Sequence, residues 1–449
     1  MYWLIPQQYV RLRNLFLLVV SYILYCLFTP VFALVLIYVS LVTFYGAKTL
    51  YNSEQLCRQK LLITLASAAF LPLLIFKYYN FVSDNLQDFF ALIGVQPLPG
   101  LNWAIPVGIS FYSFQAIGYL FDVYYKKIRC EDSILNYLLF VGFFPQVASG
   151  PISKGAELLP QLKEQRSFNY QQGVKGLQYL LWGMFLKVVV ADRLGIYVDT
   201  VYANYVHYSG VTLFVASIFY SFQIYTDFAG YSLMAIGIAR TLGVDLINNF
   251  RQPYFSVSIT DFWRRWHISL SRWLKDYVYI PLGGSRCSKL KCYRNILITF
   301  LVSGLWHGAN WTFIIWGMGH GLVQTVEKAM GVGKLSGKMV CDIPRIIFTF
   351  FMVNLLWILF RVPNLQVFSD LLYRTVASPF SGELCKDSFS SCVIGILIVL
   401  FKDFLCEKGI INQILYWNRV SRWAVYITLF VMIILFGVLD SGQFIYVSF

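Results

Sequence analysis

Long apolar runs separated by short polar segments constrain this chain more than any other feature. A transmembrane helix needs about 20 predominantly apolar residues, so repeated runs near that length predict several membrane crossings. Of the 449 residues, 58% are hydrophobic and only 13% are charged, against roughly 25% charged in soluble domains. The chain therefore lacks the polar surface of a soluble fold. The runs cover residues 14–27, 30–45, 61–76, 101–121, 134–147, 174–190, 211–238, 296–326, 346–359, 393–404 and 425–439.

Helices satisfy their own backbone hydrogen bonds inside a bilayer, and the runs have the length of helices. We therefore expect an all-α fold, a polytopic transmembrane bundle of about 10 to 12 helices. Short loops between spans predict a single domain over residues 1–449. Several runs are shorter than a full span and two are long enough to bend or double back, which predicts tilted or re-entrant helices.

Basic residues gather in the short segments between the apolar runs. The formal net charge is +14, but this placement is typical of topology signals and does not indicate nucleic-acid binding. The positive-inside rule places the densest basic segment in the cytoplasm. Contact with anionic lipids is one interpretation, and attraction of an anionic thioester donor is the other. The segment contains Arg264, Arg265, Arg272, Lys275, Arg286, Lys289, Lys291 and Arg294, of which we assign the first four to donor binding.

The same segment shows helical periodicity. Spacings of three and four residues predict an amphipathic helix over residues 261–277. Dense tryptophan is typical of the headgroup level, so we expect this helix to lie at the cytoplasmic interface or to dip partway into the membrane. On such a helix Arg264, His267 and Ser271 would share a face. The apolar positions are Trp263, Trp266, Leu270, Trp273 and Tyr277.

Polar side chains inside apolar runs need partners. Asp227 lies in the run 211–238, where a carboxylate is costly unless it is paired or hydrated. An internal ion pair and a position along a substrate tunnel are both consistent with this placement. Ser113 and Gln115 in the run 101–121 should face other helices or a cavity.

The chain has four histidines, and His307 is the first candidate for chemistry. It lies in a long apolar run, where an imidazole indicates a polar cavity. Small residues beside it, including Gly304 and Gly308, would leave room for a thin substrate. Imidazole can take the proton of an attacking hydroxyl near neutral pH, typically contributing about two to four orders of magnitude in rate. A hydrogen-bonded core histidine is the alternative.

The sequence gives weaker reasons to assign a chemical role to the other three histidines. His267 is either a functional residue or a partly solvated interfacial one. His320 lies between Gly319 and Gly321, which favours close helix contact. We interpret it as structural, and His207 as a solvated loop residue.

Other enzyme signatures are missing from the sequence. There is no Gly-x-Ser-x-Gly elbow, phosphate loop or His-Glu-x-x-His site, so we expect no metal and no bound cofactor. The nine cysteines show no paired short spacing. A disulfide between Cys385 and Cys392, outside the cytoplasm, is the one pairing we consider.

Six collinear blocks resemble the membrane-bound O-acyltransferases, in particular the bacterial branch with alginate O-acetylation and teichoic-acid D-alanylation proteins. The likeness spans nearly the whole chain. The blocks are RNLFLLVVSYILYCLFTP from Arg13, IPVGISFYSFQAIGYLFDVYY from Ile105, FVGFFPQVASGPISK from Phe140, SFQIYTDFAGYSLMAIGIARTLG from Ser221, NNFRQPYFSVSITDFWRRWHISLSRWLKDYVYIPLGGSR from Asn248, and SGLWHGANWTFIIWGMGHG from Ser303.

The resemblance implies a helical fold around a central tunnel that joins the two membrane faces. It implies that His307, in the WHG motif, is the active-site residue and that His267 is the second catalytic residue. It further implies a bacterial cytoplasmic membrane enzyme that moves an acyl group, acetyl in our expectation, onto an extracytoplasmic polysaccharide. The expected donor is acetyl-coenzyme A or an acyl-carrier thioester, and an extracytoplasmic acyltransferase partner is expected.

Two alternatives stay open at the level of sequence. The first keeps the enzyme and changes the cargo to D-alanine, delivered by a carrier protein to a cell-envelope polymer. The second is a transporter or flippase, because intramembrane polar residues and broken helices also build solute pathways. The second half of the chain does not repeat the motifs of the first, as inverted-repeat transporters would predict.

Overall fold

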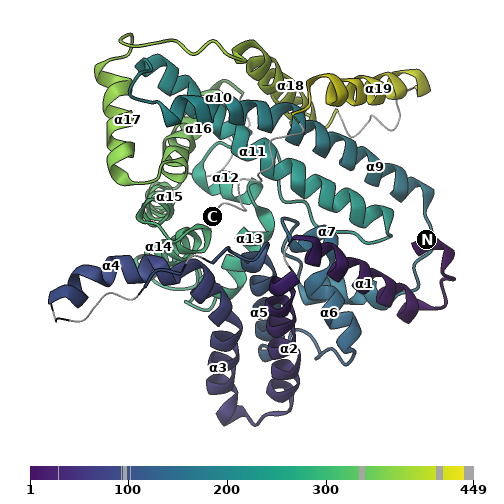
Figure 1. Ribbon diagram of the computed structural model, residues 1–449. Helices are drawn as coiled ribbons and strands as arrows, with labels where there is room; N and C mark the ends of the chain where they lie inside the picture. Colours follow the sequence, from purple (N-terminus) through teal and green to yellow (C-terminus); the bar gives the residue numbers. More distant parts are fainter. Residues whose placement is uncertain are drawn as a thin grey trace. The chain divides into compact units, whose positions relative to one another are not determined.

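The computed structural model describes residues 1–28, 30–92, 94, 99–101, 103–332, 339–410 and 418–438. Within these ranges the regular secondary structure is helical, apart from one isolated bridge between Tyr208 and Glu383 (Figure 1). The all-α prediction is confirmed.

Seven helical segments in the described ranges are long and apolar enough to cross a membrane, so the chain is a multi-pass membrane protein. Other apolar runs form shorter helices. The run 296–326 doubles back, as its length allowed, into α14 (Lys289–His307) and α15 (Trp311–Ala329). The seven segments are Val10–Leu27, Pro30–Asn52, Cys57–Gln87, Gly210–Thr241, Asp342–Arg361, Phe389–Glu407 and Arg419–Phe436.

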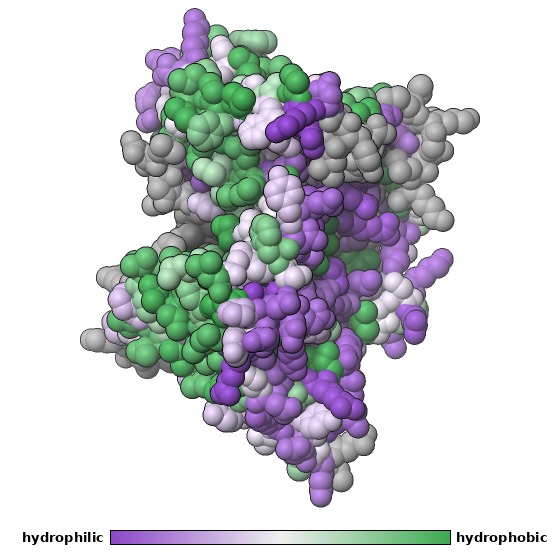
Figure 2. Space-filling view, turned by 90° about the vertical axis from the view of Figure 1, so that its right-hand side faces the viewer, coloured by the Kyte–Doolittle hydropathy of each residue, from purple (hydrophilic) through white to green (hydrophobic). Residues whose placement is uncertain are grey.

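Apolar side chains cover the outer faces of these spans. On α18 (Phe389–Glu407) Ile394, Leu397 and Phe401 are more than half exposed. Continuous hydrophobic areas lie beside polar ones on the surface in Figure 2. A bilayer would remove these areas from water, which a soluble fold could not do.

The chain divides into two compact units, and the single domain expected from sequence stays a prediction. The first unit comprises residues 1–178 and 235–247. In it α2, α3 and α5 pack side by side (Figure 1). Its helices are α1 (Val10–Phe28), α2 (Pro30–Asn52), α3 (Gln55–Leu73), α4 (Tyr79–Leu92), α5 (Ile109–Tyr124), α6 (Ile134–Gly142), α7 (Phe144–Val147), α8 (Gly155–Lys163) and the start of α9 (Tyr170–Met184).

Buried polar groups in this unit bond to other helices, as expected for the run 101–121. Gln115 on α5 donates to the carbonyl of Phe140 on α6. Tyr137 on α6 donates to the Thr43 hydroxyl on α2 at 2.8 Å. These bonds keep polar atoms away from lipid.

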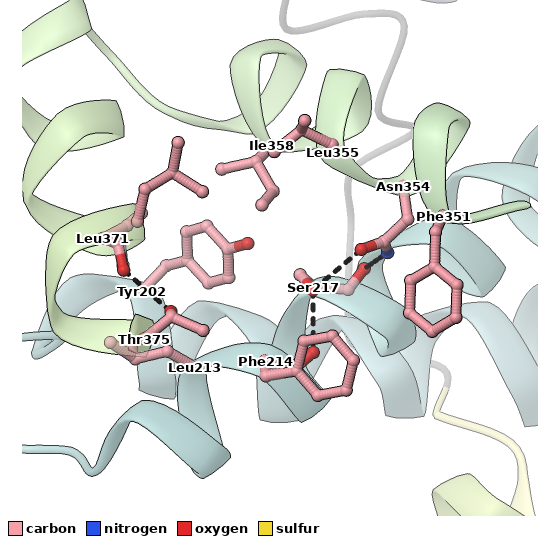
Figure 3. Close-up of a pocket in the computed structure, with 11 residues that line it drawn as sticks. Tyr202, Leu213, Phe214, Ser217, Phe351, Asn354, Leu355, Ile358, Leu371 and Thr375 are labelled. Atoms are coloured by element: carbon pink, nitrogen blue, oxygen red, sulfur yellow. Dashed lines mark hydrogen bonds between the residues drawn. The ribbon is translucent and has the colours of Figure 1, made fainter. Parts of the chain in front are cut away.

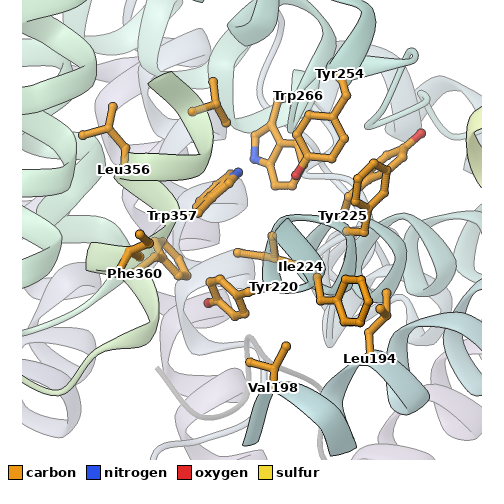
Figure 4. Close-up of a cluster of buried hydrophobic side chains, with 14 of the residues drawn as sticks. Leu194, Val198, Tyr220, Ile224, Tyr225, Tyr254, Trp266, Leu356, Trp357 and Phe360 are labelled. Carbon is orange, nitrogen blue, oxygen red and sulfur yellow. The ribbon is translucent and has the colours of Figure 1, made fainter. Parts of the chain in front are cut away.

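The second unit comprises residues 179–234 and 248–449. Its core is a large aromatic cluster, part of which is drawn in Figure 4, where Tyr254, Trp266 and Trp357 lie close together. Its helices are α10 (Asp192–Ala203), most of α11 (Gly210–Thr241), α12 (Ile259–Arg265), α13 (Ile268–Leu274), α14, α15, α16 (Met339–Arg361), α17 (Leu365–Ala377), α18 and α19 (Arg419–Phe436).

Asp227 forms an internal ion pair. The Lys187 ammonium lies 2.7 Å from a carboxylate oxygen of Asp227 and 2.7 Å from one of Asp192. Lys187 belongs to a π-helical turn, Phe185–Ala191, between α9 and α10. Of the two sequence-based interpretations of Asp227, the structure shows the ion pair.

Helix α16 presents two different faces. Trp357 and Phe360 point into the aromatic cluster (Figure 4). Leu355 and Ile358 line a cavity of about 200 Å³ between α10, α11, α16 and α17 (Figure 3). Asn354 also lines this cavity and shares a 3.1 Å hydrogen bond with Ser217.

Glycines set the distance between α14 and α15. A methyl group added at Gly304 would lie 2.4 Å from the Phe313 carbonyl oxygen, and one at Gly317 would lie 2.4 Å from that of Phe300. Because both obstacles are backbone atoms, the two helices can pack this closely only with glycine at these positions.

Replacing Gly317 with alanine should therefore destabilise the protein by about 1–3 kcal/mol through overpacking. The measurement is the thermal unfolding midpoint in detergent. Gly173→Ala in α9 is the matched control, since its added methyl meets only the Phe168 ring at 3.7 Å. Equal midpoints for the two variants would contradict the packing argument.

Candidate active site

The segment expected to form one amphipathic helix is broken at His267. Helix α12 ends at Arg265, α13 starts at Ile268, and His267 between them has a left-handed φ of 40°. Arg264 is exposed while His267 is fully buried, so they do not share a face with Ser271. The prediction of a shared face is wrong.

The same segment lies in the protein interior. Its five periodic residues, Trp263, Trp266, Leu270, Trp273 and Tyr277, are all buried by protein. The three-and-four spacing correctly marks buried positions, but it cannot distinguish burial by headgroups from burial by helices. These residues therefore pack against protein, and the depth of the segment in the membrane stays a prediction.

Two residues hold the helices that flank His267. The carbonyl of Asn249 accepts the Ile268 N–H at 2.9 Å, and its Oδ1 accepts the Ser269 N–H at 3.2 Å. At the start of α12, the Glu327 carboxylate accepts the N–H groups of Ile259 and Thr260 at 2.6 and 2.9 Å. A left-handed conformation is costly for a residue other than glycine and persists only where the surroundings enforce it.

His267 is enclosed by aromatic rings. Its solvent exposure is 0%, its ring centroid lies 4.7 Å from that of Phe228, and Trp306 lies at 5.7 Å. Burial lowers the pKa of His267 to about 3. The imidazole is therefore neutral at physiological pH.

His307 is the last residue of α14 and directly follows Trp306. Its exposure is 2%. Its ring centroid lies 4.8 Å from Trp306, 4.8 Å from Trp316 and 5.2 Å from Phe360. The Trp306 ring thus contacts both candidate catalytic histidines, which the structure brings together around it.

The glycines near His307 pack the protein and do not provide open space. A methyl group at Gly308 would lie 2.2 Å from the Phe313 ring, and Gly304 already faces the Phe313 carbonyl. The expectation that these residues leave room for a substrate is therefore wrong. Small residues in a membrane helix permit close approach, and here α15 occupies the space.

The two remaining histidines lie as expected. His320 is fully buried and accepts a 3.3 Å hydrogen bond from the Trp263 indole. A methyl group at the neighbouring Gly321 would lie 3.0 Å from Phe300, so this part of α15 is closely packed. His207 is exposed in the turn that precedes α11.

The basic residues assigned to donor binding differ in accessibility. Arg265 is buried and bonds to Asp261 at 3.1 Å and Glu407 at 2.9 Å. Arg264 and Lys275 are exposed, and Arg272 is half-buried. Arg265 therefore contributes to the structure, whatever its role toward a donor.

The disulfide considered from the sequence is absent. Cys385 and Cys392 are both free thiols. The Cys392 thiol instead approaches the Arg193 carbonyl at 3.6 Å.

Sequence reasoning missed Trp306, Asn249, Phe228 and Glu327. Trp306 adjoins His307, so a tryptophan beside the candidate base was a usable signal. Asn249, Phe228 and Glu327 act through contacts with distant segments of the chain, which residue spacing does not reveal.

The site consists of two buried imidazoles that lie near the same indole, in a helical membrane protein. An imidazole can act as a general acid or base when a reacting hydroxyl lies within hydrogen-bond reach. The fold and site thus define a polytopic membrane protein with two candidate catalytic histidines in its interior.

Comparison with known proteins identifies the family. Residues 125–362, more than half of the chain, match the model of the MBOAT, membrane-bound O-acyltransferase family. The chain belongs to this family and is an O-acyltransferase, so the transporter alternative is dropped.

Three relatives show the range of the likeness. The chain is 35% identical to the probable alginate O-acetylase AlgI of Pseudomonas aeruginosa, covering 89% of this chain and 76% of that protein. It is 34% identical to the peptidoglycan O-acetyltransferase of Helicobacter pylori, covering 90% and 79%. With the teichoic acid D-alanyltransferase of Bacillus subtilis the identity is 27%, over 58% and 65%.

Removing the Asn249 side chain should disturb the position of His267. Asn249→Ala leaves the buried Ser269 N–H without its acceptor, a loss of about 1–3 kcal/mol, and should lower acyl transfer roughly 10 to 100-fold. Asn364→Ala is the matched control, because Asn364 caps the exposed start of α17 in the same way.

Acyl transfer is measured per amount of membrane-inserted protein. If Asn249→Ala and Asn364→Ala were equally active, the role of Asn249 in holding His267 would be refuted.

Proposed function

We propose that this enzyme transfers an acyl group, acetyl in the first instance, from a cytoplasmic thioester to a hydroxyl of an extracytoplasmic polysaccharide. The transfer is direct or passes through a partner protein. The names of the alginate and peptidoglycan relatives, each matched over most of both chains, support acetyl as the cargo and a polysaccharide as the acceptor.

The proximity of both His267 and His307 to the Trp306 ring, at 5.7 and 4.8 Å between ring centroids, is the observation that carries this proposal. His307 takes the hydroxyl proton as the oxygen attacks the thioester carbonyl, and the proton then passes to the departing thiolate. His267, fixed by its strained backbone, orients the donor. A tunnel between the two membrane faces would let both substrates reach this base without crossing the membrane.

The basic segment is the proposed entry for the donor. Acetyl-coenzyme A and acyl-carrier proteins are both anionic, so clustered cations would raise their local concentration. The proposed contacts are Arg264, Arg265, Arg272 and Lys275. Arg264 and Lys275 have the most accessible side chains, whereas Asp261 and Glu407 already hold Arg265.

The proposed location of the protein is the bacterial cytoplasmic membrane. The positive-inside rule puts the basic segment on the cytoplasmic side, where thioesters are made. An extracytoplasmic acyltransferase is the proposed partner when the acyl group passes through a second protein.

D-alanyl transfer from a carrier protein to a cell-envelope polymer is the second candidate. It is favoured by the likeness to the teichoic acid D-alanyltransferase, which is weaker in identity and coverage. Thiol release by the purified enzyme distinguishes the donors. Release from acetyl-coenzyme A in the presence of an acceptor supports acetyl transfer, while a strict need for a D-alanyl-loaded carrier protein supports the alternative.

Loss of His307 should abolish acyl transfer. His307→Ala removes the proposed general base, so polysaccharide-linked ester should fall by about two to four orders of magnitude. His207→Ala is the matched control, since His207 is exposed in a turn. Ester content is measured in cells with the membrane level of each variant determined in parallel.

Retention of ester in the His307→Ala variant at equal protein level would refute the assignment of the base. Loss of ester in both histidine variants would point to an effect on expression or assembly.

A further inference from the structure

Two arginines in the first unit are buried against each other. Arg13 lies in the first turns of α1, and Arg166 lies between α8 and α9. Their exposures are 4% and 7%. Arg13 donates to the Ile5 carbonyl through Nε at 2.8 Å and Nη2 at 2.6 Å, and through Nη1 to the carbonyl of Arg166.

No carboxylate balances this double charge within the described residues. Neither guanidinium forms an ion pair there. The only side-chain bond from Arg166 runs from Nη2 to Asn14 Oδ1 at 2.6 Å. Its Nε and Nη1 are buried and make no hydrogen bond in the described structure. Two adjacent buried cations repel each other and are costly without a counter-charge.

Aromatic rings compensate this charge only in part. The Tyr2 ring centroid lies 5.3 Å from the Arg13 guanidinium carbon and 5.7 Å from that of Arg166. Trp3 lies 5.3 Å from Arg13. Burial, with the neighbouring Arg13 charge, still lowers the pKa of Arg166. Cation–π contacts are weak beside a charge-assisted hydrogen bond, so the pair retains an attraction for an anion.

Tyr2 and Trp3 also line a cavity of about 420 Å³. Its wall includes Phe168, Tyr170 and Leu177, each more than half exposed. The rings that contact the guanidinium groups thus continue into an open apolar surface. A molecule with a phosphate and a hydrocarbon chain has the two chemical parts that this arrangement would bind.

The position of Arg13 along the chain indicates which molecule would supply a phosphate to this site. Arg13 is in the first turns of the candidate span Val10–Leu27, and the end of a span lies at headgroup depth. Lipid phosphates are the concentrated anions at that depth, and guanidinium groups bind phosphate in a fork-like geometry. We propose that Arg13 and Arg166 bind the phosphate of a membrane phospholipid whose acyl chain lies in the aromatic cavity.

The test compares lipids that differ only in the phosphate. Full-length protein is purified in detergent and stripped of lipid, and its unfolding midpoint is measured with dioctanoyl phosphatidic acid, dioctanoylglycerol or inorganic phosphate. Phosphatidic acid should raise the midpoint, because a ligand that binds only the folded state stabilises it. Dioctanoylglycerol and inorganic phosphate at the same concentration should not.

Arg166→Met should lose the shift caused by phosphatidic acid. Arg11→Gln is the matched control and should keep it, because Arg11 is an exposed cation in the same turn of α1. A shift retained by Arg166→Met would overturn the proposal.

If Arg166→Met fails to accumulate, the unfolding midpoints of the wild type with the three ligands still test the proposal. Equal shifts with phosphatidic acid and dioctanoylglycerol, or no shift with either, would overturn the proposal. A full shift with inorganic phosphate alone would assign the site to a free anion and overturn the lipid as its source.

Discussion

The close approach of α14 and α15 is the contact on which the candidate site depends. Gly304 and Gly317 bring the two backbones together, and the short reversal between the helices places His307 at the end of one and Trp316 on the next. In a bilayer, apolar side chains gain little by leaving lipid for protein, so association of this kind rests on fine packing. The buried imidazole of His307 can be held in place because the distance between α14 and α15 is fixed.

The second candidate histidine, His267, is positioned by a break between two helices. His267 interrupts a segment whose periodicity would otherwise continue as one helix, and its left-handed backbone turns α13 away from α12. Asn249 and Glu327 satisfy N–H groups at the starts of these two helices. Backbone strain at one residue is thus offset by hydrogen bonds from two others. Strain of this kind, held by its surroundings, is typical of functional sites.

Sequence reasoning reached the fold class, while the catalytic roles of His267 and His307 stay predictions. Periodicity grouped Trp266 with the other apolar positions of its segment, all of which the structure buries, and hydropathy marked Asp227 as a carboxylate that needs a partner. Sequence reasoning failed at His267, because a break in a helix is decided by contacts with Asn249, which is distant along the chain. It also failed at Gly304 and Gly308, since small residues are compatible with either a cavity or a neighbouring helix, and only the packing partner Phe313 distinguishes them.

The buried cations discussed above fall into two groups. In one group carboxylates of the protein neutralise the charge, and in the other a ligand could do so. Lys187 and Arg265 each contact two carboxylates, so the protein itself neutralises them. Arg13 and Arg166 receive only carbonyl, amide and ring contacts within the described residues. If burial alone explained the arginine pair, a carboxylate would be the expected partner, as it is for Lys187. An anion from outside the chain explains the difference, and a lipid phosphate is the anion found where a membrane span ends.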